Sequence, residues 1–152
     1  MTHEDFMKYF LGIDIGTSGA KVLALAENGS IAATAQQEYP LSTPQPLWAE
    51  QDPELWWNAA RICIGKVLLQ IPATDIAAVG LTGQMHGLVM LDKSGNVLRP
   101  AILWCDQRTA SQCAEITETV GAETLIAETC NPVLTGFTAP KILWVRRHEP
   151  RI

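Results

Sequence analysis

Residues 11–21 read LGIDIGTSGAK, and this stretch decides the fold that we expect. Leu11, Ile13 and Ile15 alternate with glycine and aspartate, which is the period of a strand with one buried face. Apolar residues return after Lys21, so the stretch predicts two strands joined as a hairpin by a glycine-rich loop. A Walker P-loop and a dinucleotide-binding fingerprint both need a helix after the loop, so neither motif fits.

The loop and its flanks offer groups that suit a metal ion and a phosphate. Asp14 lies near the end of the first strand, where a carboxylate can hold a hydrated Mg²⁺ ion. Gly16 lets the backbone approach a ligand closely. Thr17 and Ser18 offer hydroxyl and amide groups to phosphate oxygens, and Lys21 adds a positive charge. On this stretch alone, a glycine-rich turn with an exposed aspartate remains the alternative.

The length and composition are typical of a globular protein. It has 152 residues, 47% of them hydrophobic and 18% charged, which is enough for one domain with a core. The net charge of −5, without a basic run, argues against nucleic acid as a partner. The sequence contains no run of about 18 apolar residues, so it predicts no membrane-spanning helix.

Two further patterns bear on location. Residues 1–8 lack the apolar centre of a secretion signal, and we interpret them as a short N-terminal extension. The cysteines show no metal-binding spacing, and we interpret them as reduced core or near-core thiols of a cytoplasmic protein. They are Cys63, Cys105, Cys113 and Cys130.

The first half of the chain predicts a meander and then a helix. Strands are expected over residues 9–15, 21–26 and 30–39, with a tight turn at Asn28-Gly29 before the third. Asp52 and Pro53 are typical of a helix start. The following apolar residues recur at helical spacing and predict one buried stripe. They are Trp56, Ala59, Ala60, Cys63, Val67, Leu68 and Ile71.

The second half predicts shorter elements. Residues 76–81 are apolar and follow a helix, which predicts a buried parallel strand. A hairpin is expected around residues 93–96 and a short strand over 101–104. Three helices should follow, over 108–120, 122–128 and from an N-cap at Thr138 to about 147. The first of them should bury Ala110, Cys113, Ile116 and Val120, and Gly121 should cap it. Three antiparallel strands followed by helix and strand units predict an α/β fold with a ribonuclease-H-like mixed sheet.

Five motifs together resemble the FGGY family of carbohydrate kinases, and among them most closely the xylulokinases. The resemblance covers about residues 10–150. The Gln-Met-His segment separates xylulokinases from glycerol kinases, which carry an Arg-Glu pair there. The motifs are GIDIGTS (12–18), LWAEQDP (47–53), GQMHG (83–87), RPAILWCD (99–106) and GFTAPK (136–141).

The resemblance implies an actin-like ATPase fold and transfer of the ATP γ-phosphoryl group to D-xylulose, giving D-xylulose 5-phosphate. ATP and Mg²⁺ would be the cofactors, D-xylulose the substrate, and a second copy the protein partner considered. Asp14 would lie by the metal, and the phosphate-binding residues would be Gly16, Thr17, Ser18 and Lys21. The sugar-binding residues would be Gln84, Met85, His86, Trp104 and Asp106.

Three of the expected sugar-binding residues also have a purely structural interpretation. A lone histidine such as His86 is usually structural, Trp104 can be core, and Asp106 can cap the helix that starts near Arg108.

The chain departs from the family in one respect. The catalytic aspartate of FGGY kinases, the general base, lies downstream of the GFTAPK segment, so we expect no catalytic residue within residues 1–152. Residues 9–152 are therefore expected to form part of the N-terminal lobe, with the second lobe absent and this chain inactive alone. The alternatives are an FGGY kinase for ribulose or gluconate, or a sugar-binding module without catalysis.

Overall fold

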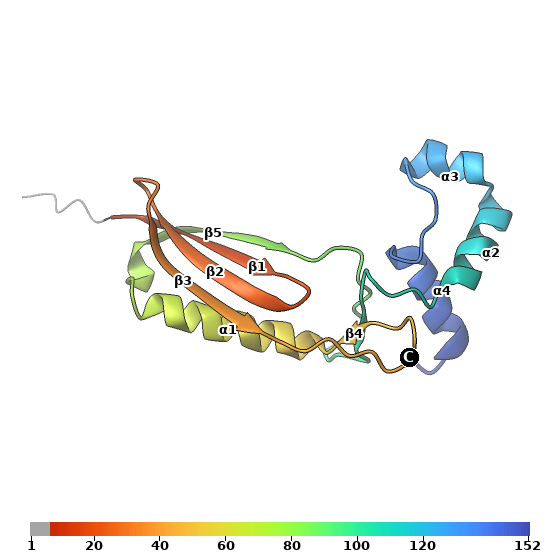
Figure 1. Cartoon of the computed structure of the whole chain (residues 1–152), viewed down its shortest axis with the longest axis horizontal. Coiled ribbons are helices and arrows are strands. Elements are labelled where there is room, and N and C mark those ends of the chain that lie inside the picture. The colour runs from red at the N-terminus through yellow and green to blue at the C-terminus, as the bar shows by residue number, and fades with distance from the viewer. Residues whose placement is uncertain (1–6) are drawn as a thin grey trace, which may run out of the picture. The chain divides into compact units, whose positions relative to one another are not determined.

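A computed structural model describes residues 7–152, which fall into two units. Unit 1 comprises residues 7–40 and 54–84, and unit 2 comprises residues 41–53 and 85–152. Figure 1 labels the helices and strands of both. Most of the predicted N-terminal extension, residues 1–6, lies outside the described residues. Within residues 7–152, no helix is both long enough and apolar enough to cross a membrane.

Unit 1 is built on a four-stranded mixed sheet. Its strands are β1 (Tyr9–Ile15), β2 (Gly19–Ala26), β3 (Ile31–Glu38) and β5 (Ile76–Gly83). The spatial order is β3-β2-β1-β5; the first three strands are antiparallel, and β5 runs parallel to β1. This confirms the predicted meander followed by a parallel strand. Gly29 takes a φ of 84° in the turn before β3, as the Asn-Gly pair predicts.

Helix α1 (Pro53–Leu68) packs along one face of this sheet (Figure 1). Its predicted stripe is confirmed, because Cys63 and Val67 meet Val22 and Ala24 of β2 in the core. Trp57 lies off the stripe and is 60% exposed. Full burial of an apolar side chain contributes about 1.5–3 kcal/mol, so this stripe holds the helix against the sheet. A 3-10 turn, η1 (Ala73–Asp75), leads into β5.

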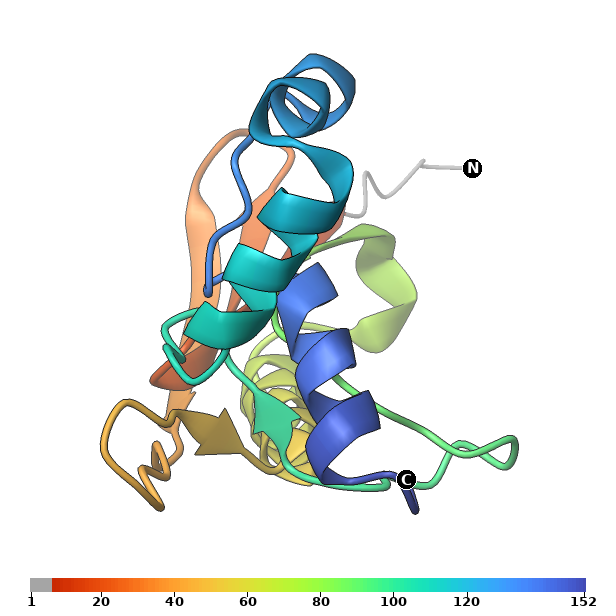
Figure 2. The same cartoon turned by 90° about the vertical axis from the view of Figure 1, so that its right-hand side faces the viewer.

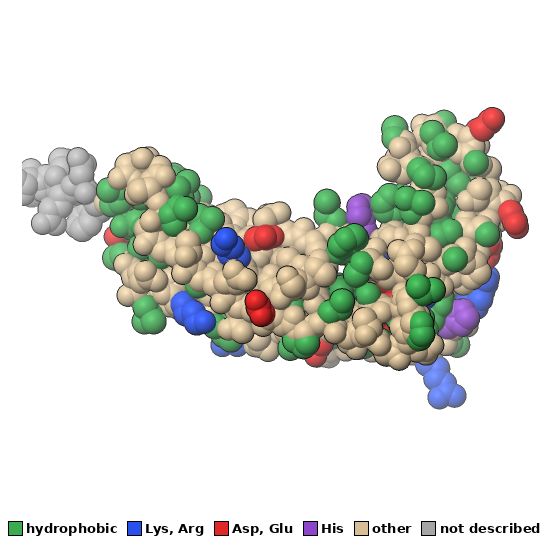
Figure 3. All heavy atoms as spheres, in the orientation of Figure 1, with side chains coloured by type: hydrophobic (Ala, Val, Ile, Leu, Met, Phe, Trp, Pro, Cys, Tyr) green, Lys and Arg blue, Asp and Glu red, His purple; other side chains and the backbone are tan. Residues whose placement is uncertain are grey.

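The expectation that β5 is buried is wrong. Val79 is 60% exposed and Leu81 is 75% exposed. β5 is an edge strand of the described sheet. Of its residues, Ile76 packs against the core under α1. An apolar run shows that a strand can be buried, but it does not supply the layer that covers it. Figure 3 accordingly shows hydrophobic side chains at the surface of unit 1.

Unit 2 combines a two-stranded ladder with three helices (Figure 2). Strand β4 (Glu50–Gln51) pairs antiparallel with β6 (Ala101–Ile102). The helices are α2 (Ala110–Val120), α3 (Ala122–Thr129) and α4 (Thr138–His148), which confirms three predicted helices. The predicted hairpin survives as a bridge between Leu91 and Val97. Strand β4 was not predicted, because two residues are too short to show a period.

Three details of unit 2 differ from expectation. The stripe predicted on α2 is confirmed only in part: Cys113 and Ile116 are partly buried, whereas Val120 is 46% exposed and the buried residue of α2 is Gln112. Ala110, at the start of α2, is also exposed. Thr138 is the first residue of α4 and not its N-cap, which is Phe137. Gly121 does end α2, with a φ of 88°.

The cysteines are free thiols in the described residues, but they are not all near a core. Cys63 is buried, Cys105 and Cys113 are partly buried, and Cys130 is exposed. Burial raises the pKa of the Cys63 and Cys113 thiols. The prediction therefore fails at Cys130, which is exposed and takes a left-handed backbone conformation just after α3.

Candidate functional site

The hairpin loop of unit 1 is closed by its own backbone. The Gly16 N–H donates to the carbonyl of Gly19 at 3.0 Å. A Cβ atom at Gly19 would lie 2.8 Å from the carbonyl oxygen of Gln37 on β3, so a side chain there would push two strands apart. Glycine is thus required by a close approach between strands, and the loop that carries Thr17 and Ser18 stays narrow.

Tyr39 supports this loop from the end of β3, and the sequence analysis missed it. Its hydroxyl donates to the carbonyl of Gly16 at 2.5 Å, and its N–H donates to the carbonyl of Ser18 at 3.2 Å. Burial raises the pKa of the Tyr39 hydroxyl, and the negative charge of Asp14 raises it further. Tyr39 therefore stays a neutral donor that fixes the loop beside Asp14.

A hollow of about 470 Å³ lies on the open face of the sheet next to the loop. Asp14 is opposite Lys21 on β2 and beside Thr82 on β5, and all three line the hollow. Directly paired residues of neighbouring strands share a face, so a carboxylate, an ammonium group and a hydroxyl come together here. The predicted Asp14 and Lys21 are thus brought to one place, which an anion with its counter-ion would suit.

The donors at this hollow fit a magnesium ion that keeps most of its water. Mg²⁺ is usually held by one or two carboxylates together with waters and substrate phosphates. Asp14 is exposed and supplies one such carboxylate. Among residues 7–152 there is no group of three or more His, Cys, Asp or Glu side chains that could hold a metal. A hydrated ion at Asp14 is therefore compatible with these residues, and a fully protein-ligated metal is not.

Gln84 lies beside the phosphate loop of unit 1, although the sequence analysis grouped it with Met85 and His86. The Thr17 hydroxyl donates to the Gln84 side-chain oxygen at 3.3 Å. The Gln84 N–H donates to the carbonyl of Ile15 at 2.8 Å. The boundary between the units falls directly after Gln84, so the Gln-Met-His segment is divided between them.

Unit 2 carries a second hollow, of about 360 Å³, where His86 and Trp104 meet. Trp104 is 48% exposed, and the His86 ring lies 4.8 Å from the ring of Phe137. Met85 is 70% exposed and is not among the lining residues. The other lining residues come from the loops before α2 and α4: Gln107, Leu134, Thr135, Gly136 and Phe137. Aromatic rings and amide or hydroxyl groups without a carboxylate suit a neutral polyol more than a cation.

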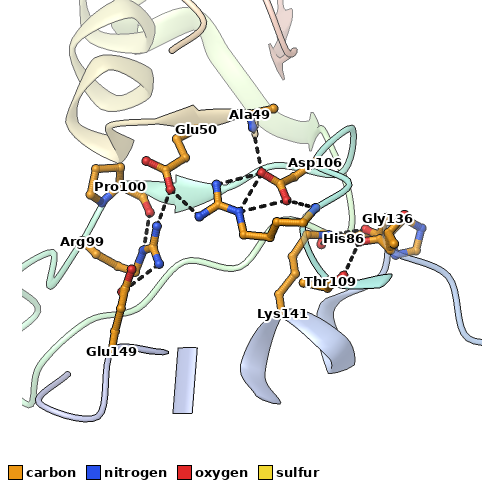
Figure 4. Close-up of polar contacts among 12 residues, drawn as sticks. Ala49, Glu50, His86, Arg99, Pro100, Asp106, Thr109, Gly136, Lys141 and Glu149 are labelled. Carbon is orange, nitrogen blue, oxygen red and sulfur yellow. Dashed lines mark hydrogen bonds and ion pairs between the residues drawn. The ribbon is translucent and has the colours of Figure 1, made fainter. Parts of the chain in front are cut away.

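Asp106 is fully buried, and both of its carboxylate oxygens are used within the protein (Figure 4). One oxygen accepts the Ala49 N–H at 2.7 Å, and the other accepts the Arg108 N–H at 2.9 Å. The Arg108 guanidinium group also donates to both oxygens at 2.8 to 3.0 Å. The carboxylate therefore holds the loop that follows Trp104 and precedes α2. It does not cap that helix, because the N-cap of α2 is Thr109.

Arg108 continues this network into a buried charged cluster, which the sequence analysis also missed. Its second nitrogen lies 2.7 Å from Glu50, which in turn contacts Arg99 at 2.5 Å (Figure 4). The guanidinium group stacks 3.6 Å above the Trp48 ring. Trp48 packs edge-on against Trp144 of α4 at 5.3 Å. This buried charged cluster fixes β4, β6 and α4 around the Trp104 loop.

Lys141 of α4 is the third residue that the sequence analysis missed, although it lies in the GFTAPK motif. Its side chain is fully buried. The ammonium group donates to the carbonyl oxygens of His86 at 3.2 Å, Phe137 at 3.1 Å and Gly136 (Figure 4). Burial lowers the pKa of Lys141 to about 8, against the opposing charge of Asp106. A lysine between a proline and an apolar run gave no signal of this contact.

Comparisons with known proteins show the family to which the chain belongs. Residues 9–152 match the family described as the FGGY family of carbohydrate kinases, N-terminal domain. The xylulose kinase of Escherichia coli (strain K12) is 47% identical over 143 residues, or 94% of this chain and 29% of that relative. The xylulose kinase of Bacillus subtilis (strain 168) is 43% identical over 148 residues, or 96% and 30%.

A solved structure gives the same result for the fold. The xylulose kinase of Rhodospirillum rubrum has a TM-score of 0.90 and 33% identity, over 95% of this chain and 30% of that one. This confirms the expected mixed α/β, actin-like ATPase fold. The chain thus spans about three tenths of the length of the relatives that it matches. Over residues 9–152, the chain belongs to the FGGY family of carbohydrate kinases, as its N-terminal domain.

Proposed function

We propose that the chain forms the N-terminal part of a kinase that transfers the γ-phosphoryl group of ATP to D-xylulose, giving D-xylulose 5-phosphate. The observation that carries the sugar side is the unit 2 hollow, where His86 of the Gln-Met-His segment and Trp104 meet. The likeness to xylulose kinases over 94–96% of the chain supports the same sugar. We also propose a cytoplasmic location, from the cysteine pattern, and a homodimer, from the family resemblance.

The roles of the phosphate-side residues follow from their chemistry. The narrow loop at Gly16, Thr17 and Ser18 offers amide and hydroxyl donors to phosphate oxygens, and Lys21 adds a positive charge on the same sheet face. Asp14 would hold a hydrated magnesium ion, which when bound neutralises charge on the phosphates. Phosphoryl transfer depends mainly on such positioning and charge neutralisation, so these residues need to be held and need not react.

The sugar-side residues have a binding role. His86 would exchange hydrogen bonds with sugar hydroxyl groups, and Trp104 would offer an aromatic face to the sugar. Gln84 and Met85 directly precede His86 in the chain, and the family resemblance implies that they also contact the sugar. Asp106 would act through its bonds to Ala49 and Arg108 and hold the Trp104 loop.

We further propose that the general base comes from another part of the protein. A base must reach the hydroxyl proton that it accepts, within about 2.6–3.2 Å or through one water. The residues that line the unit 2 hollow include no aspartate or glutamate. Residues 1–152 alone are therefore expected to bind sugar without phosphorylating it.

A titration of tryptophan emission tests the sugar assignment. The chain is titrated with D-xylulose, and D-ribulose and D-gluconate serve as rival sugars. We expect a saturable change with D-xylulose that is lost in Trp104→Phe and kept in Trp57→Phe, the matched control with an exposed tryptophan in unit 1. A response to D-ribulose or D-gluconate alone would instead select an FGGY kinase for that sugar.

A further inference from the structure

The carbonyl oxygen of His86 accepts two side-chain donors from helix α4. Lys141 Nζ lies 3.2 Å away and the Thr138 hydroxyl 3.1 Å away. His86 itself has a φ of 64°, a left-handed conformation that residues other than glycine adopt only when their surroundings fix it. These two hydrogen bonds hold the peptide group that carries the His86 carbonyl, and so help to fix the left-handed conformation.

Lys141 ties three lining residues of the unit 2 hollow together. A protonated lysine has three N–H donors, and here they meet three carbonyl oxygens, those of His86, Gly136 and Phe137. All three residues line the hollow. One buried side chain of α4 thus connects the Gln-Met-His segment to the loop before α4, and residues of both segments line the hollow.

We propose that Lys141, assisted by Thr138, is a positioning residue that fixes the left-handed backbone of His86 and so sets the direction of its ring at the hollow. The backbone part of this proposal stands on the contacts alone. Its consequence for sugar binding rests on the proposed function.

A change of pH gives this role a signature. The ionisable groups that act on Lys141 are Asp106, Arg108 and Cys105 of the preceding loop and Cys113 of α2. When the ammonium group loses a proton above about pH 8, two N–H donors remain for three carbonyl oxygens. At least one of the three carbonyl contacts, among them that of His86, must then be lost or weakened. The backbone signals of His86 should therefore change near pH 8.

The experiment follows the backbone NMR signals of His86 in the whole 152-residue chain, without ligand, from pH 6.5 to 9.5. Lys141→Met removes all three N–H donors, and Thr138→Val removes only the hydroxyl. Lys93→Met, at an exposed lysine of the same unit, is the control for the first. Thr119→Val is the control for the second, because its hydroxyl bonds to a helix carbonyl of α2 far from His86 in sequence.

Three results support the proposal. The His86 signals of the unmutated chain move with a midpoint near pH 8, this step is absent in Lys141→Met, and Thr138→Val makes it larger. Affinity for D-xylulose should fall about tenfold in Lys141→Met and about threefold in Thr138→Val, against no change in both controls, which is the range for losing one positioned contact.

Unchanged His86 signals in Thr138→Val, together with no step near pH 8 in the unmutated chain, would overturn the proposal. These two arms decide the matter even where Lys141→Met does not fold. Failure of the proposed function looks different: the His86 signals would respond as described, but D-xylulose would not bind to the unmutated chain at all.

Discussion

The two units hold their candidate sites in different ways. In unit 1 the backbone does the positioning: strand register places Asp14 opposite Lys21, and a close approach of two strands keeps the loop narrow. In unit 2 buried charges do it: Arg108, Asp106 and Lys141 fix loops that have little regular structure of their own. The comparison teaches that an open site on a sheet tolerates exposed charges, whereas a hollow between loops needs an internal frame.

The largest effect is expected from the frame of unit 2. Arg108→Met leaves the buried carboxylates of Asp106 and Glu50 without their shared partner, and breaking such a pair costs about 3–5 kcal/mol. Urea unfolding of the chain measures the loss. Arg147→Met is the matched control: it removes the exposed ion pair to Glu115, which is worth about 0–1 kcal/mol. Equal losses in the two variants would mean that the buried charged cluster does not hold unit 2 together.

The next effect is a rise in stability with pH that comes from Lys141 of unit 2. The pKa of Lys141 is about 8 in the folded chain against 10.5 for an ordinary lysine. Between these values the unfolded chain binds a proton that the folded chain does not, so the free energy of unfolding rises with pH. At about 1.4 kcal/mol per pKa unit, the gain is about 3 kcal/mol.

Unfolding in urea at a series of pH values measures this gain, and Lys141→Met should remove it. Equal changes in the free energy of unfolding from pH 8 to 10.5 in the unmutated chain and in Lys141→Met would contradict the burial of a protonated lysine. This comparison cancels the opposite effect of the raised pKa values of Cys63, Cys113 and Tyr39. Loss of one proton from Lys141 should thus raise the free energy of unfolding and, in the same pH range, weaken the hydrogen bond to the His86 carbonyl.

A smaller effect is expected from the backbone of unit 1. Gly19→Ala places a Cβ atom 2.8 Å from the Gln37 carbonyl, and the resulting strand shift should cost about 1–3 kcal/mol. Gly65→Ala of α1 is the control, because a Cβ atom there meets nothing within 4 Å and Gly65 does not line the hollow. Binding of Mg²⁺-ATP to the loop should weaken in the first variant and not in the second. Similar behaviour of both variants would show that backbone spacing does not shape the loop.

The same contrast explains what could be predicted from the sequence. Alternating apolar residues and the Asn-Gly turn predict the meander of unit 1, because these signals are local. Arg108 and Lys141 each contact a residue more than 50 positions away, Glu50 and His86, and no local pattern reveals such pairs. Tyr39 was missed for the same reason, since its hydroxyl contacts Gly16 across two strands.

Errors in the prediction of burial have a different physical origin. The apolar sequence of β5 predicts a buried strand. Burial also requires another element to pack against the strand, and Leu81 is exposed. Asp106 shows the reverse case, because a carboxylate next to Trp104 looks accessible in the sequence and is fully buried by Arg108 and Ala49.

The central claim is that the sugar binds at the hollow of unit 2 and the nucleotide phosphates bind at the loop of unit 1. Backbone NMR of the chain, titrated separately with D-xylulose and with Mg²⁺-ATP, tests this most directly. D-xylulose should move the signals of His86, Trp104 and residues 134–137, and Mg²⁺-ATP should move those of residues 12–21 and Thr82. Movement of the unit 1 loop by the sugar, with the unit 2 hollow unaffected, would contradict the claim.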